Sequence, residues 1–135
     1  MGRFPNSAYT TNKVPTETQE QIALMEWAAV MQGRYAELAL LFHIPNEGKR
    51  SYQVGGQMRR MGLKRGVPDL FLPVARGGWH GLFVEMKSAK GRPTPEQREW
   101  LAALQEQGYA AIIAHGWREA AEQIEAYING KMERS

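Results

Sequence analysis

The sequence predicts an α/β fold in which a mixed β-sheet is flanked by helices. The segment from Asp69 to Lys87 reads as strand, turn and strand, with turn residues at Arg76-Gly77-Gly78, which is typical of a β-hairpin. Beyond it, residues 94–107 read as a helix and residues 109–115 as a short apolar strand. The second hairpin strand and this strand should therefore pair in parallel through a right-handed helical crossover.

The hairpin register follows from the positions of its turn residues. If Asp69 lies opposite Glu85, paired residue numbers sum to 154 and the turn centres on Gly77. Because side chains alternate between the two faces of a strand, this register makes one face wholly apolar: Leu70, Leu72, Val74, Leu82, Val84 and Met86. The opposite face gathers the polar and aromatic residues: Asp69, Glu85 and Lys87, with Phe71 and Phe83 beside them.

The two facing carboxylates have a chemical consequence. Carboxylates that lie side by side repel each other, and partial burial strengthens the repulsion. A cation must offset them, and a hard divalent ion such as Mg²⁺ prefers carboxylate, carbonyl and water oxygens as ligands. We therefore expect Asp69 and Glu85 to bind a metal ion.

The first half of the chain predicts a helix, a strand and a basic stretch. Residues 16–33 are helical, with a capping box at Thr18-x-x-Gln21. Four of its residues form an apolar stripe: Ile22, Met25, Ala29 and Val30. Glu20 lies on another flank, in line with Ala23, Leu24 and Trp27. The apolar run 38–44 is a strand in its second half, and residues 51–61 are helical.

The second half carries clearer helix signals. Thr94 is the expected N-cap, Pro95 takes the first helical position and Gln97 completes a capping box, while Gly108 ends the helix. A last helix over residues 117–128 buries one apolar stripe: Ala121, Ile124 and Ile128.

Composition and length indicate one ordinary globular domain. The chain has 135 residues, of which 43% are hydrophobic and 23% charged. We expect a flexible arm over residues 1–15, a single domain over 16–128 and a polar tail over 129–135. No apolar run approaches a membrane span, no signal-peptide pattern opens the chain, and without cysteine there are no disulfides or thiolate metal sites. These features predict a cytoplasmic protein that does not bind membranes.

The positive charge is concentrated in one segment. Residues 49–65 contain six cations and no acid: Lys49, Arg50, Arg59, Arg60, Lys64 and Arg65. Subtracting these six charges from the net charge of +3 leaves the rest of the chain at −3. A solvated helix face is the alternative, but cations that lead directly into an acidic hairpin favour contact with nucleic-acid phosphates.

The hairpin motif resembles a known superfamily. Pro68-Asp69 followed by Glu85-x-Lys87 is similar to the PD-(D/E)xK nuclease pattern. The flanking residues resemble its VRR-NUC branch, in the stand-alone form of phages and bacteria: Gly66-Val67, Ser88, Gly91 and Pro95-Glu96-Gln97. The resemblance covers about residues 16–128 and implies a restriction-endonuclease-like αβββαβ core, which agrees with the order of elements above.

The resemblance also implies roles for individual residues. Asp69 and Glu85 would ligate Mg²⁺ or Mn²⁺ together with the Met86 backbone carbonyl, and Lys87 would position the attacking water. A third carboxylate is implied from the first helix, best matched by Glu20, with Glu17 one turn earlier as its competitor. Gln97 is a further candidate. We assign His43, His80 and His115 structural roles because they are too scattered to form a metal triad.

Together these features predict a metal-dependent, structure-selective DNA endonuclease. Stand-alone members of the family resemble homodimeric Holliday-junction resolvases, so branched DNA and a second copy of the chain are the expected partners, in a bacterial or phage-infected cell. A flap or nicking nuclease, or the nuclease subunit of a repair or restriction complex, is the alternative. A DNA-binding module with an inactive site is disfavoured because Asp69, Glu85 and Lys87 are all present.

Overall fold

A computed structural model describes residues 13–46 and 52–134 of the chain. The expected residues Lys49 and Arg50, and most of the expected arm, lie outside this range. The described elements are, in order, α1 (Glu17–Met31), the 3₁₀ helix η2 (Ala36–Leu40), β1 (Phe42–His43), α2 (Tyr52–Arg60), β2 (Leu70–Leu72), β3 (Leu82–Lys87), α3 (Pro95–Glu106), β4 (Ala110–His115) and α4 (Trp117–Ile128). Their arrangement confirms the predicted α/β class.

The four strands form one mixed sheet in the order β1-β2-β3-β4. β1, β2 and β3 are antiparallel neighbours, and β4 pairs parallel to β3 as predicted. Leu70 pairs with Val84 and Leu72 with Leu82, which confirms the predicted sum of 154. Gly77 and Gly78, with φ of 59° and 89°, make the turn between the bridged residues Arg76 and Trp79, so its centre lies half a residue beyond Gly77.

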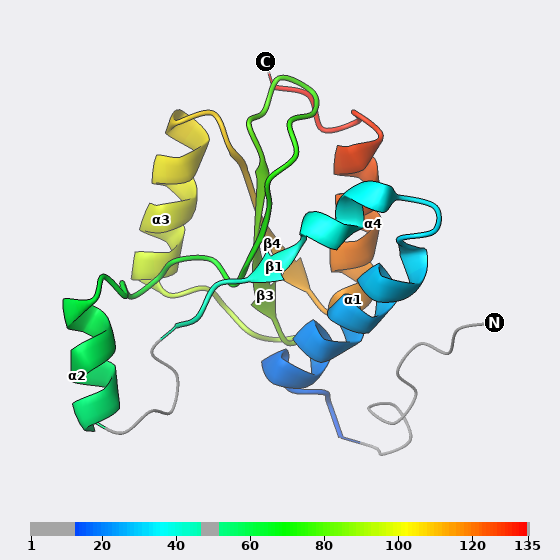
Figure 1. The fold of residues 1–135 in the computed structure, drawn as a ribbon. Helices are drawn as coiled ribbons and strands as arrows, with labels where there is room; N and C mark the ends of the chain where they lie inside the picture. The colour runs from blue at the N-terminus through cyan, green and yellow to red at the C-terminus, as the bar shows by residue number, and fades with distance from the viewer. Residues whose placement is uncertain (1–12, 47–51, 135) are drawn as a thin grey trace.

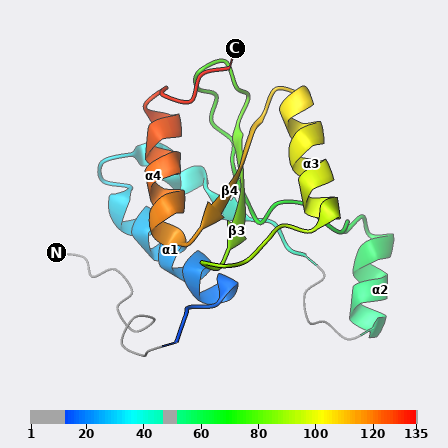
Figure 2. The ribbon, with the colours of Figure 1, turned by 180° about the vertical axis from the view of Figure 1, so that it is seen from behind.

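The sheet separates two unequal layers. α1 and α4 cover one face, and α3 lies on the other, at the β4 side (Figures 1 and 2). The covered face contains the main core, in which the predicted apolar hairpin face packs against α1 and α4. Leu70, Val84 and Met86 are at most 1% exposed. The face that carries Asp69 and Glu85 is therefore the less covered one.

The α1 prediction was wrong in two details. The capping box is formed by Thr16 and Gln19, not by Thr18 and Gln21. The buried face consists of Glu20, Ala23, Leu24, Trp27 and Ala28. Most of the predicted stripe faces outward instead, with Ile22 55% exposed and Val30 45% exposed, whereas Met25 is partly buried against the core. Because α1 has apolar side chains on both sides, its own periodicity did not identify the side that packs.

The second half of the chain follows the prediction closely. Thr94 and Gln97 form the expected capping box, Pro95 opens α3, and α4 has the predicted bounds. The C-terminal tail packs against the hairpin turn: Trp79 Nε1 donates to the Met132 carbonyl at 2.6 Å, and Arg134 N donates to the Gly77 carbonyl at 2.8 Å. No helix among the described residues is both long and apolar enough to cross a membrane.

Candidate active site

Asp69 is held rigidly at the end of the hairpin. Its side chain is 8% exposed, and its Oδ2 accepts a 2.7 Å hydrogen bond from the Met86 backbone N–H. Its Oδ1 faces Asn46, whose Nδ2 lies 3.4 Å away. A carboxylate held by a backbone donor of the neighbouring strand has little freedom to rotate, so Asp69 presents a fixed oxygen toward the surrounding cavities.

Glu85 is a buried carboxyl group with incomplete partners. Its Oε2 accepts from Gln97 Nε2 at 3.0 Å and lies 3.4 Å from Lys87 Nζ, while its Oε1 is buried without a hydrogen-bond partner. Burial first, and the negative charge of Asp69 second, raise the pKa of Glu85 to about 8, although Lys87 acts in the opposite direction. The site therefore has a shortage of positive charge when both carboxyl groups are ionised.

Lys87 lies on the same face as Glu85 and is buried. Its side chain is 6% exposed, and Nζ lies 3.8 Å from Glu17 Oε1 in addition to its contact with Glu85. A buried lysine needs paired negative charge, which these two glutamates supply. The amine is thus placed between the sheet and the first turn of α1.

The two candidates for a third carboxylate occupy different environments. Glu17 is half-exposed, approaches Lys87, and lines the same cavity as Asp69. Glu20 is 5% exposed, and its Oε1 accepts a 3.0 Å hydrogen bond from the backbone N–H of Trp117, the first residue of α4. The structure therefore brings Glu17 toward the site and places the Glu20 carboxylate at the N-terminus of α4.

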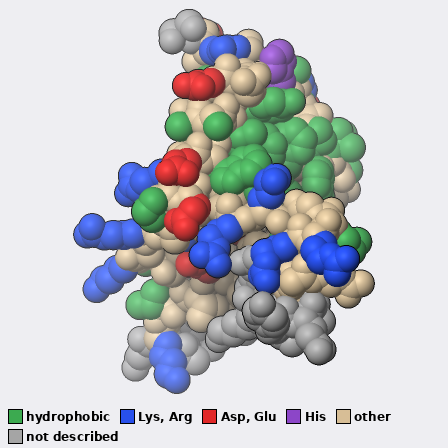
Figure 3. Space-filling model, turned by 90° about the vertical axis from the view of Figure 1, so that its left-hand side faces the viewer, with side chains coloured by type: hydrophobic (Ala, Val, Ile, Leu, Met, Phe, Trp, Pro, Cys, Tyr) green, Lys and Arg blue, Asp and Glu red, His purple; other side chains and the backbone are tan. Residues whose placement is uncertain are grey.

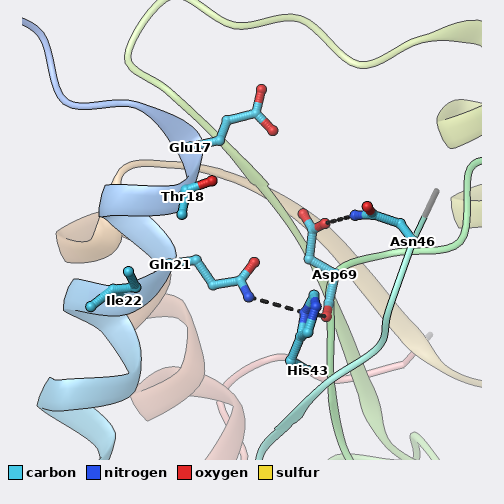
Figure 4. Close-up of a pocket in the computed structure, with 7 residues that line it drawn as sticks. All are labelled: Glu17, Thr18, Gln21, Ile22, His43, Asn46 and Asp69. Carbon is cyan, nitrogen blue, oxygen red and sulfur yellow. Dashed lines mark hydrogen bonds between the residues drawn. The ribbon is translucent and has the colours of Figure 1, made fainter. Parts of the chain in front are cut away.

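Two cavities meet at Asp69. The first, of about 240 Å³, lies between α1 and the sheet edge and is lined by Glu17, Thr18, Gln21, Ile22, His43, Asn46 and Asp69 (Figure 4). The second, of about 340 Å³, lies between the segment before β2 and the start of α3, and is lined by Asn46, Arg65, Gly66, Val67, Asp69, Thr94, Glu96 and Gln97. Asp69 and Asn46 line both cavities, so a bound chain could contact the carboxylate from either side.

Three residues at the site were not predicted from the sequence: Gln21, His43 and Asn46. His43 Nδ1 lies 3.0 Å from the Asp69 carbonyl and 3.0 Å from Gln21 Nε2, and Asn46 faces the Asp69 carboxylate (Figure 4). His43, for which we expected a structural role, therefore lies in the wall of the first cavity. His80 contacts Tyr109, and His115 Nε2 lies 2.9 Å from the Gly91 carbonyl, both away from the two cavities.

Gln97 performs two functions with one amide. Its Oε1 accepts from Thr94 N at 2.8 Å, which completes the α3 cap, and its Nε2 donates to Glu85. Gln97→Ala should cost about 1 kcal/mol of unfolding free energy through the cap. It should also raise the pKa of Glu85 further, because a donor to the charged form is lost. Urea unfolding between pH 5 and pH 9 would measure both effects.

Thr94→Ala is the matched control for Gln97→Ala. The Thr94 Oγ1 forms the other half of the same cap by accepting a 3.2 Å hydrogen bond from Gln97 N. Its removal leaves the donor to Glu85 in place. Both variants should lose similar stability at pH 5, and only Gln97→Ala should steepen the loss toward pH 9. Superimposable pH profiles would contradict the link between Gln97 and Glu85.

The basic residues that the structure describes lie at the end of α2, which projects below α3 in Figure 1, and in the segment that follows α2. The described members are all exposed: Arg59, Arg60, Lys64 and Arg65. Of these, Arg65 lines the second cavity with Asp69. The structure thus connects one predicted cation directly to the carboxylate.

The donor set suits a hard metal ion but is not a closed cage. Within residues 13–46 and 52–134, no three carboxylate or imidazole groups lie together closely enough to hold a metal by themselves. The unpartnered Glu85 Oε1 and the raised pKa of Glu85 are the features that a bound cation would relieve. Such a site would need additional oxygens from backbone, water or substrate, which is usual for Mg²⁺.

Comparison with known proteins decides the family. Residues 15–117 match the model of the VRR-NUC domain. The chain belongs to the VRR-NUC family. A solved structure described as a VRR_NUC domain protein superposes with a TM-score of 0.73 and 30% sequence identity, over 87% of this chain and 91% of that one. No curated protein matches. The matched residues include Asp69, Glu85 and Lys87, and the general context of the family is the PD-(D/E)xK nuclease superfamily.

Proposed function

We propose that this VRR-NUC protein is a metal-dependent endonuclease that cleaves phosphodiester bonds in branched DNA. The observation that carries the proposal is the arrangement of two facing carboxyl groups and a buried lysine at one end of the hairpin, beside two cavities that share Asp69. One of these carboxyl groups, Glu85, has an oxygen without a partner and a pKa raised to about 8. Both features suit a site that operates with an added cation.

The residues divide the work as follows. Asp69 and Glu85, with the Met86 backbone carbonyl, would hold Mg²⁺ or Mn²⁺. When bound, that ion would polarise the phosphodiester and lower the pKa of a bound water. The Met86 N–H orients Asp69 through its 2.7 Å hydrogen bond, and Gln97 orients Glu85. Lys87 supplies a fixed positive charge for the phosphate oxygens as negative charge develops on them.

Charge around the site supports DNA as the substrate. Arg65 lines the cavity next to Asp69. Arg59 and Arg60 are the last two residues of α2, and Lys64 lies in the segment that follows it. Cations of this kind contact phosphates without reading sequence. Selection would therefore depend on DNA shape, as at a four-way junction or a flap.

A homodimer of the junction-resolvase type is part of this proposal, because a two-fold axis would place two sites symmetrically on a four-way junction. Two aromatic residues near the hairpin turn and on α4 do not offer a dimer surface, because Tyr127 is fully buried and Trp79 contacts the tail. The outward side of α1, where Ile22 and Met25 line a groove, is the apolar surface that fits a second copy better.

The test is cleavage of a labelled four-way junction beside a flap and a linear duplex of matching sequence, in Mg²⁺, Mn²⁺ or EDTA. We expect metal-dependent cuts near the branch, with Asp69→Ala and Lys87→Ala as inactive controls. Paired symmetric cuts and a dimeric mass by light scattering would support the resolvase form. Cuts in the flap alone would retain the nuclease and reject that form, while DNA binding without any cleavage would reject the proposal.

A further inference from the structure

Three phenylalanine rings lie side by side across the sheet. The strand register pairs Phe42 with Phe71 and Phe71 with Phe83. The Phe71 and Phe83 rings are stacked, with centroids 4.2 Å apart, and Phe42 meets Phe71 edge-on at 5.9 Å. We call these three residues the aromatic row. Tyr109 packs against its inner end, 5.5 Å from Phe83.

The aromatic row is on the less covered face of the sheet. The residues that alternate with it, Leu70, Leu72 and Val84, are fully buried under α1 and α4. On the opposite face Phe42 is 48% exposed, and Phe71 and Phe83 are partly exposed. Figure 3, which views the side that bears α2 and α3, shows hydrophobic side chains gathered in one patch next to Lys and Arg side chains. Aromatic surface left open in this way marks a binding site.

The row is also the immediate neighbour of the carboxylates. Phe71 is two residues from Asp69 on one strand, and Phe83 is two residues from Glu85 on the next. Two residues of strand correspond to about 6.6 Å, and they place both pairs on the same face. A nucleic-acid strand that placed a phosphate at Asp69 would therefore pass within reach of the aromatic row.

We propose that the aromatic row stacks the bases of an unpaired nucleic-acid strand next to the phosphate that is cut. The substrate would then be DNA with a single-stranded segment at the branch, rather than continuous duplex. Every base has a π-face, so an aromatic platform beside cations binds single strands with little sequence preference. This inference rests on the proposed nuclease function and specifies its substrate.

Two observations favour a nucleic-acid strand over a second copy of the chain as the occupant. The row continues directly into the carboxylate pair, where a phosphate and not a protein surface is expected. Arg65 lines the cavity beside Asp69, and the α2 cations lie on the same side of the molecule, so the surroundings suit a polyanion.

Binding in EDTA tests the row without requiring cleavage. Fluorescence anisotropy would compare a labelled single-stranded oligodeoxynucleotide with a blunt duplex, for wild type, Phe42→Ala, Phe42→Leu and Phe42→Tyr. We expect Phe42→Ala and Phe42→Leu to weaken single-strand binding about five-fold or more, and Phe42→Tyr to retain it because the ring remains. Duplex binding should change less than two-fold.

Val30→Ala, which shortens an equally exposed apolar residue on the far side of the sheet, is the control and should change neither affinity. Equal single-strand affinity for wild type and Phe42→Ala would overturn the inference. So would a mass halved by Phe42→Ala in light scattering, since that result would assign the row to a second copy. A protein that binds single strands through Phe42 but cleaves nothing would instead reject the proposed function.

Discussion

Replacing Glu85 with glutamine should abolish cleavage and, at pH 8, make the metal-free protein more stable. The carboxyl group is 1% exposed, one of its oxygens has no partner, and Asp69 lies beside it. Glutamine has the same shape without the charge, and its amide nitrogen can donate toward the Asp69 carboxylate. Loss of a metal-binding carboxylate should reduce the cleavage rate by at least about 100-fold.

The direction of the stability change follows from the pKa. Burial raises the pKa of Glu85 from its ordinary value of 4.5 to about 8 in the folded protein, so the folded state holds its proton more tightly than the unfolded state. The free energy of unfolding therefore falls as pH rises from about 4.5 to 8, because folding then disfavours an ionised group. A pKa shift of this size lowers the free energy of unfolding by a few kcal/mol at pH 8 and leaves it unchanged below pH 4.

Urea unfolding of both proteins at pH 5 and pH 8, with and without Mg²⁺, would measure this. We expect wild type to be less stable at pH 8 than Glu85→Gln, and Mg²⁺ to stabilise wild type more than the variant, because binding to the folded state adds to its stability. A variant that is less stable than wild type at pH 8 would show that the Glu85 charge is already compensated inside the protein.

The hairpin was predictable because its information is local. Alternation of apolar and polar residues predicted the two faces. The glycine pair at 77 and 78 supported the register and predicted the turn centre to within half a residue. The capping box at Thr94 and Gln97 likewise lies within four residues. Signals of this kind need no knowledge of what packs against the segment.

The facing of α1 was not predictable in the same way. Two overlapping Thr-x-x-Gln patterns offered alternative caps, and apolar residues occupy both sides of the helix. Which side is buried depends on α4, almost a hundred residues later, whose first backbone N–H is bonded to Glu20. The same limitation hid His43 and Asn46, since only the pairing of β1 with β2 brings them to Asp69.

Removing the charge of Glu20 should lower the stability of the protein, whereas removing the charge of Glu17 should lower its cleavage activity. Glu20 accepts from the first N–H of α4, whose N-cap is Gly116 and has no side chain to do so; a Cβ at that glycine would come within 3.4 Å of the Glu20 carboxylate. Glu20→Gln should therefore cost about 1–2 kcal/mol of stability, because an anion at a helix N-terminus interacts favourably with the dipole.

Glu17→Gln should instead leave stability nearly unchanged, because the side chain is half-exposed, while it lowers cleavage about ten-fold or more and weakens the response to Mg²⁺. Glu17 faces Lys87 and the cavity at Asp69, so its charge can act on the site. Cleavage rates at saturating and limiting Mg²⁺, combined with thermal unfolding of both variants, separate the two roles. A Glu20→Gln protein that is fully stable but inactive would assign the role of third carboxylate to Glu20. A substitution that removes activity without lowering stability must affect a group that acts at the site.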